Sequence, residues 1–465
     1  MKNNILIFIA LLLQLTAKTQ GTFEKIITKG STETAWSVIQ TSDGGYAFLG
    51  SFGATPGYDR WLVKTDNMGD TLWSKTFRGI GNEDGDRSLI QTADGGFTFI
   101  ANRSGKADLL HTSSSGDSLW EKEMFSGIGI SIAHTSNQGY VVTGPNETGS
   151  VINIAYAGTG GVLVWAKTYK PNAGSSSSCR SWTVSEIPGN GFVVAGGITS
   201  NYGFSKPFVM KVGATGDSIW CRSYSWYMDA TIYSADIVGN GDLYVCGIEQ
   251  NSNANTMVMR LNATGDTVWT RVQAVSGNQY FNSIRTTGDG GAIACGSYSN
   301  SSDSNMVYLA KYSEAGSISW QKKIGNYKNS FGLSIEATAD NGYIICGEVE
   351  QTATSSHHGL LIKTDSNGNL TGIESHVAEM GCYFYPNPAA NLTTLKIKNI
   401  NNGCLVKLRL YDEFGHEVKS VELSSGKNGY QLDVTGLPEG LYLAVVESNG
   451  QFIGRLKLVV RGIVL

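Results

Sequence analysis

The chain has 465 residues, of which 41% are hydrophobic and 16% are charged, and its formal net charge is −4. This composition is typical of a globular protein and excludes a disordered chain. Because no run or stripe of basic residues occurs, a nucleic-acid partner is not expected.

Residues 1–21 have the pattern of a secretory signal peptide. Lys2 supplies the positive charge at the start, and Ile5–Leu15 is an apolar run that is too short to span a bilayer. The alternative is a retained membrane anchor. No later segment reaches membrane-spanning length, so we expect no transmembrane segment after signal removal.

Residues 22–372 contain a sequence repeated with a period of about 50 residues. The first copy reads TSDGGYAFLG and then WLVKTDNMGDTLWSKTF, between Thr41 and Phe77. Each copy has four strand-like runs, which in the first copy are residues 36–41, 46–51, 61–65 and 71–77. SDGG and DNMG are tight-turn sequences, and four antiparallel strands per copy predict the blade of a β-propeller.

Two residue types recur in these copies. A glycine closes the second strand of six copies, with Ala101 in its place once: Gly50, Gly144, Gly196, Gly247, Gly296 and Gly347. A tryptophan occurs in the fourth strand of six copies: Trp73, Trp120, Trp165, Trp220, Trp269 and Trp320.

The seventh copy lacks a fourth strand. Phe23–Ile27 aligns with Trp73–Phe77, so we expect the N-terminal strand to complete the last blade. Such closure removes the exposed edges of an open sheet. The prediction is an all-β fold with a seven-bladed β-propeller closed by the N-terminal strand; six and eight blades are the alternatives.

The hairpin VKTDNMGDTLW resembles the ALDxxTGxxxW repeat of PQQ-type quinoprotein propellers. In that family the tryptophan docks between neighbouring blades, and the resemblance implies this role for the six tryptophans. Quinoprotein enzymes typically have eight blades and a cofactor site. The sequence has neither feature, so no cofactor is expected and enzymatic activity does not carry over.

After a linker at residues 373–382, residues 383–465 alternate short strands with turn signals, as in a small Ig-like β-sandwich. This part resembles the C-terminal sorting domain of proteins exported by the type IX secretion system of Bacteroidota. The matching positions include the opening YPNP motif, the LxxGxY element and the closing strand, with the residues Tyr385, Pro386, Asn387, Pro388, Gly440, Tyr442 and Lys457.

The resemblance implies a partner and a location. The partner is the type IX secretion translocon, which reads the C-terminal domain. The location is extracellular or on the surface of a Gram-negative bacterium. An ordinary accessory β-sandwich is the alternative.

Residues that often form metal or catalytic sites have no such spacing here. Three of the seven cysteines, Cys246, Cys295 and Cys346, recur at one repeat position and are expected to be small buried side chains. Whether Cys382 and Cys404 pair stays open. His111 stands where other copies have lysine and is expected to be exposed.

Weak metal sites are conceivable in two places. The pair His357–His358 is expected in a loop, and residues 82–86 read NEDGD, but neither place has the full ligand set that zinc or calcium requires. The aspartates of the SDGG and ADGG turns are expected to be structural, because tight turns use Asp and Gly.

The innermost strands carry a hydroxyl at one aligned position in every copy: Ser37, Ser88, Ser131, Thr183, Ser234, Ser283 and Ser334. Two residues further on, Asp236, Arg285 and Glu336 stand in consecutive copies and are expected to line the central channel. One interpretation is that the hydroxyls bond between blades and the three charges pair with one another, because buried charges need partners. The other interpretation is a ligand site at the channel mouth.

The variable loops predicted to share one face are rich in Tyr, Trp, Asn, Ser and Gly, which suits a recognition surface. Solvated loops are the alternative, because loops favour small polar residues. Our candidate contact residues are Trp182, Tyr202, Tyr224, Trp226 and Tyr227.

These patterns favour a secreted or cell-surface protein that binds a glycan or a protein through its loop face. One alternative is an extracellular polysaccharide-acting hydrolase or lyase that uses Asp236 and Glu336. Another is a structural surface component. An enzyme is less favoured because no nucleophile or acid–base pair is apparent.

Overall fold

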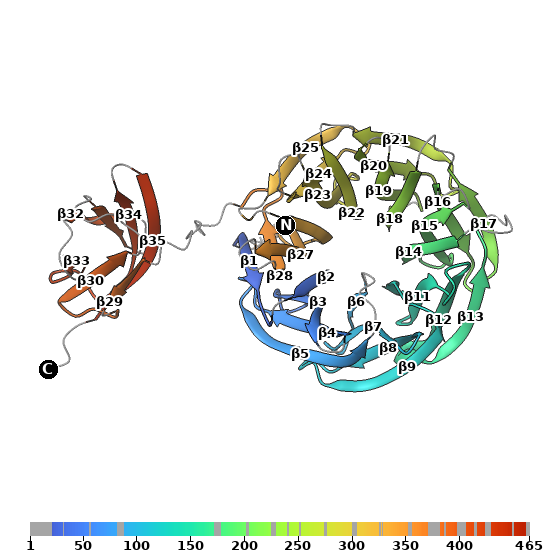
Figure 1. Cartoon of the computed structure of the whole chain (residues 1–465), viewed down its shortest axis with the longest axis horizontal. Helices are drawn as coiled ribbons and strands as arrows, with labels where there is room; N and C mark the ends of the chain where they lie inside the picture. The colour runs from blue at the N-terminus through green and yellow to red at the C-terminus, as the bar shows by residue number, and fades with distance from the viewer. Residues whose placement is uncertain are drawn as a thin grey trace, which may run out of the picture. The chain divides into compact units, whose positions relative to one another are not determined.

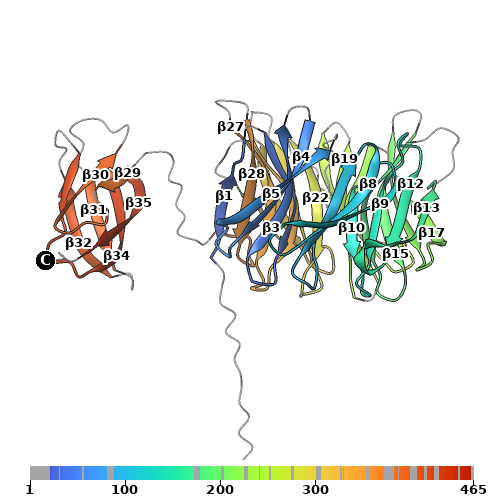
Figure 2. The same cartoon turned by 90° about the horizontal axis from the view of Figure 1, so that it is seen from below.

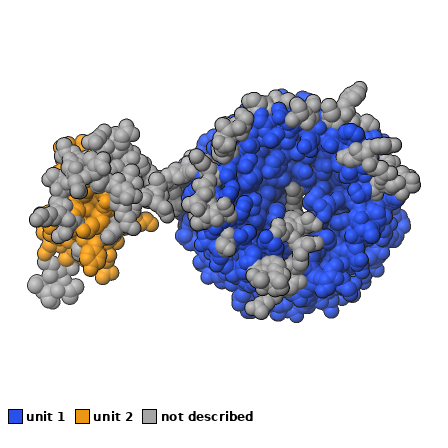
Figure 3. Space-filling model, in the orientation of Figure 1, with its two compact units in different colours: residues 1–371 blue, residues 372–465 orange. Residues whose placement is uncertain are grey.

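The structure is a computed structural model that divides into two compact units, residues 1–371 and residues 372–465, coloured separately in Figure 3. The residues that it describes are 21–30, 32–54, 57–80, 88–171, 178–200, 204–224, 229–239, 241–250, 253–273, 277–299, 305–324, 327, 329–351, 356–370, 382–385, 387–397, 406–412, 416–423, 429–448 and 451–461. Nearly all of the predicted signal peptide and linker lie outside these residues, as does the weak calcium candidate at 82–86.

The described part of the first unit forms seven four-stranded antiparallel sheets. Three come first in the chain: β2 (Glu33–Gln40), β3 (Tyr46–Ala54), β4 (Gly57–Thr65) and β5 (Thr71–Ile80); β6 (Leu89–Gln91), β7 (Phe97–Arg103), β8 (Lys106–Thr112) and β9 (Ser118–Ser126); β10 (Ser131–His134), β11 (Tyr140–Pro145), β12 (Ile152–Ala157) and β13 (Leu163–Tyr169). A single 3-10 turn, η1 (Thr159–Gly161), joins β12 to β13.

Three further sheets continue the same order, and the last sheet completes the set. They are β14 (Ser178–Glu186), β15 (Phe192–Thr199), β16 (Ser205–Val212) and β17 (Ser218–Ser223); β18 (Asp229–Ile237), β19 (Leu243–Gln250), β20 (Ala254–Leu261) and β21 (Thr267–Gln273); β22 (Asn278–Thr286), β23 (Ala292–Ser299), β24 (Asn305–Tyr312) and β25 (Ile318–Ile324); β26 (Ser330–Ala337), β27 (Tyr343–Gln351), β28 (Ser356–Thr364) and β1 (Phe23–Ile27).

These sheets stand side by side around a central axis, with the first strand of each sheet innermost and the fourth strand at the rim (Figure 1). The arrangement is propeller-like and all-β, as the repeat predicts. No helix among the described residues has the length and apolarity needed to cross a bilayer.

The last sheet takes its fourth strand from the N-terminus. β1 pairs antiparallel with β28, with Phe23 opposite Lys363 and Ile27 opposite Gly359. Phe23 is 1% exposed and packs in one core cluster with Tyr46, Phe48 and Leu361. The strand that is missing from the seventh copy of the repeat is therefore supplied by the segment that the alignment indicated.

The glycine that closes the second strand of each repeat allows a bulge in the innermost strand. A Cβ at Gly247 would lie 1.9 Å from the carbonyl oxygen of Thr231, beside the register shift between Ile232 and Ser234. Gly50, Gly196, Gly296 and Gly347 approach a carbonyl oxygen of the innermost strand in the same way, whereas Gly144 approaches the carbonyl oxygen of Ile128, which precedes β10. A side chain here would push the two strands apart, because the extra bulged residue brings the backbones into close contact.

Neighbouring sheets meet through an aromatic ring stacked on a hairpin glycine. Gly116 has a φ of +81°, and a Cβ on it would lie 2.7 Å from Trp73 of the preceding sheet. The six tryptophans contact Gly116, Gly161, Gly216, Gly265, Gly316 and Gly368 in this manner. At the junction between the last and first sheets Phe23 takes the place of the tryptophan, at 2.5 Å from the position of a Cβ on Gly69.

The aligned hydroxyls bond between sheets near the central axis. The Ser37 hydroxyl accepts a hydrogen bond from the Leu89 N–H at 3.3 Å, and the Ser334 hydroxyl accepts one from the Val38 N–H at 3.5 Å. Ser131, Ser234 and Ser283 accept equivalent bonds from the next sheet. These bonds agree with the structural interpretation of the hydroxyls.

The second unit is a small β-sandwich of two sheets (Figure 2). Its strands are β29 (Cys382–Tyr385), β30 (Leu392–Ile397) and β33 (Tyr430–Asp433) in one sheet, and β31 (Val406–Tyr411), β32 (Glu417–Leu423), β34 (Gly440–Ser448) and β35 (Gln451–Val460) in the other. Leu395 and Leu432 of the first sheet share a core cluster with Leu408 and Ala444 of the second. The alternating apolar residues of the sequence therefore meet between the sheets.

We expect Phe23→Ala to lower the free energy of unfolding of the protein by about 3–5 kcal/mol, the usual cost of truncating a buried Phe. The substitution also removes the ring that covers Gly69. Chemical denaturation measures the loss. Phe23→Trp, which restores the residue of the other six copies, is the control and should cost much less. An unchanged midpoint in Phe23→Ala would contradict a structural role for β1.

Candidate functional site

A cavity of about 500 Å³ lies where the variable segments of three neighbouring sheets come together. We call it the loop-face pocket. It is lined by the segment 145–149 between β11 and β12, the first residues of β14, and parts of β15, β16 and β18. The side chains of Arg180, Trp182 and Tyr233 form part of its wall.

The two aromatic residues stand at bulged positions of innermost strands. Trp182 lies in the register shift between Ser181 and Thr183, and Tyr233 lies in the shift between Ile232 and Ser234. A bulge changes the direction of a side chain, and these two line the same pocket. The repeat glycines thus allow the bulges, and the bulges place the aromatic rings.

Within the loop-face pocket the rings and one cation form a connected group. Trp182 and Tyr233 are in edge-to-face contact, with 5.5 Å between ring centroids. The Arg180 guanidinium carbon lies 4.9 Å from the centroid of Trp182, within the range of a cation–π interaction. Glu147 also lines the pocket, so the wall combines rigid aromatic area with charged groups of both signs.

The other aromatic candidates are not in this group. Tyr202, Trp226 and Tyr227 lie outside the described residues. Tyr224 donates its hydroxyl hydrogen to the carbonyl oxygen of Gly265 at 2.8 Å, and burial raises the pKa of its hydroxyl. Its side chain therefore joins two sheets near the rim. Tyr233 was not among the residues predicted from the sequence. Its position could have indicated it, because Tyr233 directly precedes the aligned Ser234 as Trp182 precedes the aligned Thr183.

Asp236, Arg285 and Glu336 do line one cavity, which lies on the central axis and measures about 210 Å³. The Arg285 Nε lies 2.6 Å from a Glu336 carboxylate oxygen. Asp236 instead accepts two hydrogen bonds of 2.7 Å from the N–H and hydroxyl of Thr286. The expected mutual pairing thus holds for two of the three charges, and the third bonds to the last residue of the neighbouring strand β22.

Glu336 lies in an environment that disfavours its charge. Burial raises the pKa of the Glu336 carboxyl, and the nearby Asp236 adds to that effect, while the Arg285 guanidinium opposes both. The carboxylate is thus held charged mainly by one cation. The role of these residues in ligand binding stays a prediction.

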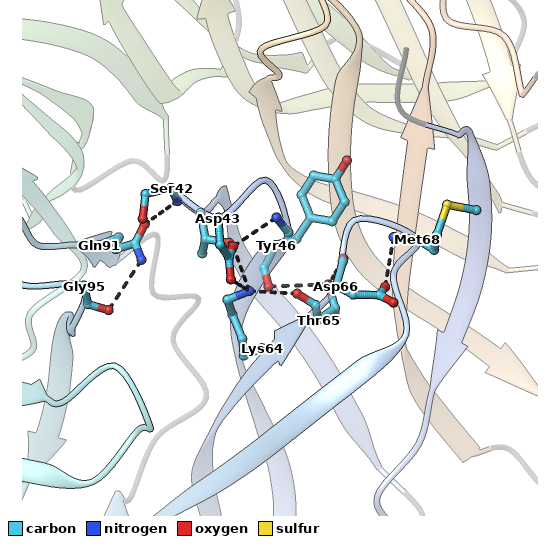
Figure 4. A network of polar contacts seen from close by, with 11 residues as sticks. Ser42, Asp43, Tyr46, Lys64, Thr65, Asp66, Met68, Gln91 and Gly95 are labelled. Atoms are coloured by element: carbon cyan, nitrogen blue, oxygen red, sulfur yellow. Dashed lines mark hydrogen bonds and ion pairs between the residues drawn. The ribbon is translucent and has the colours of Figure 1, made fainter. Parts of the chain in front are cut away.

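The Asp of the SDGG turn binds a buried cation of the same sheet. The Lys64 Nζ lies 2.7 Å from the Asp43 carboxylate, which also accepts bonds from the Thr41 hydroxyl and the Gly45 N–H (Figure 4). Burial opposes the charge of Asp43, but these bonds outweigh burial and lower its pKa to about 2. The turn aspartates are therefore structural, as expected.

A comparable contact recurs in five of the other six sheets. The penultimate residue of the third strand contacts a turn carboxylate in the pairs His111–Asp94, Arg260–Asp242, Lys311–Asp289 and Lys363–Asp340. In the third sheet the equivalent contact is reversed, because the Asn137 side-chain N–H donates to the Tyr156 hydroxyl oxygen.

Two expectations about histidines are wrong. His111 is not exposed: it is 5% exposed, hydrogen-bonded to Thr98 at 2.9 Å and stacked on Trp120, because it occupies the buried cation position of its sheet. His357 and His358 are not in a loop but in β28, and His358 bonds to the buried Glu33 at 2.7 Å.

Cys246, Cys295 and Cys346 are buried, as predicted, while Cys404 lies outside the described residues. In the part of the chain that the structure describes, no three His, Cys, Asp or Glu side chains are grouped so as to hold a metal ion.

The sorting-motif residues serve two purposes in the second unit. Asn387 binds the closing strand, with its side-chain N–H on the carbonyl of Lys457 at 2.8 Å and its oxygen on the N–H of Val459 at 2.9 Å. Tyr442 is buried and donates to the Pro438 carbonyl at 2.6 Å.

Other motif positions are at the surface. Tyr385 is 70% exposed, and Asn387, Pro388, Gly440 and Lys457 are also exposed, while Pro386 lies outside the described residues. Asn387 and Tyr442 thus stabilise the sandwich, while the side chains of Tyr385, Pro388 and Lys457 remain accessible.

Residues 383–461 match the family described as "Secretion system C-terminal sorting domain". The chain thus carries a C-terminal sorting domain of the type IX secretion system. This domain implies recognition by the type IX secretion system and export across the outer membrane, to the cell surface or the extracellular space. No curated protein matches the chain significantly.

Several solved structures overlap with the chain at low identity. Sqt1 from Chaetomium thermophilum is 9% identical with a TM-score of 0.46, covering 74% of this chain and 100% of that one. A protein of unknown function from Bacteroides caccae is 12% identical with a TM-score of 0.38, covering 63% and 94%. Drosophila Plexin A, in complex with Semaphorin 1b, is 8% identical with a TM-score of 0.42, covering 72% and 88%. At these values no argument about function rests on the likeness.

We expect Arg285→Met to destabilise the sorting-domain protein by about 2 kcal/mol at pH 8, because it leaves the Glu336 carboxylate without its cation. The pKa of Glu336 is already raised in the folded state and should rise further. Stability is therefore lost as the pH rises through that folded value and regained at pH 4, where the carboxyl is protonated.

Urea denaturation of wild type and variant at both pH values measures this difference. Arg285→Met combined with Glu336→Leu is the control and should recover most of the stability at pH 8. An equal loss at both pH values would contradict the pairing.

Proposed function

We propose that this type IX-exported protein is a seven-bladed β-propeller, closed by its N-terminal strand, that binds glycans through its loop-face pocket. The observation that carries the proposal is the edge-to-face pair of Trp182 and Tyr233 beside Arg180 in a cavity of about 500 Å³. A binding site of this size usually combines apolar area with a few polar groups.

Sugars fit such a wall because they present C–H faces to aromatic rings and hydroxyls to charged groups. The two rings are held by a bulged backbone and by mutual contact, so little conformational entropy is lost on binding. Export to the outside of the cell supports the proposal, because extracellular polysaccharides are accessible there. A protein ligand at the same rings is the alternative outcome.

A hydrolase or lyase that uses Asp236 and Glu336 is the second candidate, supported by the raised pKa of Glu336. Against it, Arg285 and Thr286 already occupy the two carboxylates, and the cavity of about 210 Å³ is small for a polysaccharide. We therefore place binding first. A structural surface component is a third candidate that no particular contact favours.

Glycan-array binding of the mature propeller, followed by calorimetry with the best glycan, tests the proposal. Trp182→Ala should weaken binding at least tenfold, because an aromatic side chain that anchors a ligand in a pocket typically contributes more than about 1 kcal/mol to the binding free energy. Tyr233→Ala should weaken it similarly.

Trp36→Ala is the matched control, because Trp36 takes the same bulged position in β2 and lies outside the pocket. Binding that survives Trp182→Ala would overturn the site. Turnover of a polysaccharide that is lost in Asp236→Ala or Glu336→Ala would overturn the proposal in favour of the enzyme, and capture of a protein but no glycan would change the ligand class.

A further inference from the structure

A second cavity, of about 460 Å³, lies at the opposite end of β14 from the loop-face pocket. We call it the turn-face pocket. It is bounded by the turn 187–191 of one sheet and by Val238, Gly239 and Gly241 of the next. Glu186, Lys211 and Asp236 are the charged residues that line it.

Lys211 occupies the position at which Lys64, Lys311 and Lys363 of other sheets pair with a turn aspartate. It is the penultimate residue of β16, as Lys64 is of β4 and Lys311 of β24. Its exposed fraction is 8%, close to the 5% of Lys64 and the 6% of Lys311. The fold therefore buries Lys211 as it buries lysines that bind a turn carboxylate (Figure 4).

The turn beside Lys211 has lost its acid. It reads Ile187-Pro188-Gly189-Asn190-Gly191, so Gly189 stands where Asp43 stands in the first sheet and Ile187 stands where Thr41 stands. Gly189 has a φ of +70°, and a proline before a residue of positive φ is the pattern of a type II turn. Within the part of the chain that the structure describes, Lys211 has no hydrogen-bond or ion-pair partner.

The Lys211 side chain is largely buried and lines the cavity without a protein partner among the described residues, so an anion that enters the cavity would gain a charge-assisted hydrogen bond. In the sheets of Lys64 and Lys311 the lysine pairs with a carboxylate that a turn N–H also holds. We propose that the turn-face pocket binds a small carboxylate ligand, whose carboxylate takes the place of the missing aspartate side chain at Lys211.

Glu186 and Asp236 restrict what else the ligand can carry. Glu186 accepts bonds from the N–H and hydroxyl of Ser136, and Asp236 accepts bonds from Thr286, so both are charged acceptors held at the same cavity. They would repel a second negative charge and accept hydrogen bonds from hydroxyls. The ligand class that fits is a monoanionic sugar acid, such as a uronic acid.

The site is separate from the loop-face pocket, so it goes beyond the proposed function. Trp182→Ala should leave it unchanged, and Lys211→Met should leave the loop-face glycan bound. Failure of either proposal is then visible without the other.

Calorimetric titration of the mature propeller with glucuronate, glucose and acetate tests the inference. Glucuronate should bind, glucose should not, and acetate should bind at least tenfold more weakly because it lacks the hydroxyls. Lys211→Met should abolish glucuronate binding. Gly189→Asp should also abolish it, because the new carboxylate fills the site; the space at Gly189 is open, and Asp tolerates positive φ better than most residues.

Two control variants make the result decisive. Gly189→Asn has the same size and backbone demand as Gly189→Asp but no charge, and should retain more binding. Lys363→Met should lower the melting temperature because it leaves the buried Asp340 carboxylate without its cation, whereas Lys211→Met should leave the melting temperature unchanged or raise it. A melting temperature that falls equally in both lysine variants would overturn the unpaired state of Lys211.

Three results of the titration would overturn the proposal. They are no glucuronate binding by wild type, glucuronate binding that survives Lys211→Met, and glucuronate binding that survives Gly189→Asp. Equal binding of acetate and glucuronate would keep the carboxylate contact but overturn the sugar-acid assignment.

Discussion

The first unit depends on one contact, an aromatic ring of each sheet stacked on the hairpin glycine of the next. The glycine must lack a side chain, since a Cβ on Gly116 or Gly161 would meet a tryptophan ring at 2.7 Å or 2.5 Å. Because every sheet donates a ring and accepts one, the last sheet can meet the first only if it also has a ring. Phe23 supplies it, so the N-terminal segment is part of the fold.

The same scaffold places the residues that we assign to binding. A glycine in the second strand allows a bulge in the innermost strand, and the bulged residue varies from sheet to sheet: Trp36, Trp182 and Tyr233 are three examples. A fixed backbone feature thus holds variable side chains. Two aromatic residues in neighbouring sheets then form one pocket wall.

Departures from the repeat are as informative as the repeat. His111 takes the place of a lysine and keeps the contact to the turn aspartate, so the contact between the third strand and the turn is preserved in that sheet. Gly189 takes the place of an aspartate and leaves Lys211 buried without a partner among the described residues, so that change opens a cavity. In both sheets the fold buries the third-strand residue in the same way, and only the turn decides whether it is paired.

The sequence by itself determined the architecture and the export route. Three local patterns carry this information: the period of the repeat, the fourth strand missing from its seventh copy, and the sorting motif around Asn387 and Tyr442. Local patterns can be recognised in the sequence alone. Only the tertiary structure decided which side chains meet. Tyr224 lies away from the loop-face pocket and Tyr233 lies in it, Asp236 is not part of the Arg285–Glu336 pair, and His111 is buried. The sequence did not show these contacts, because contacts between sheets join residues about 50 positions apart, which no local pattern encodes.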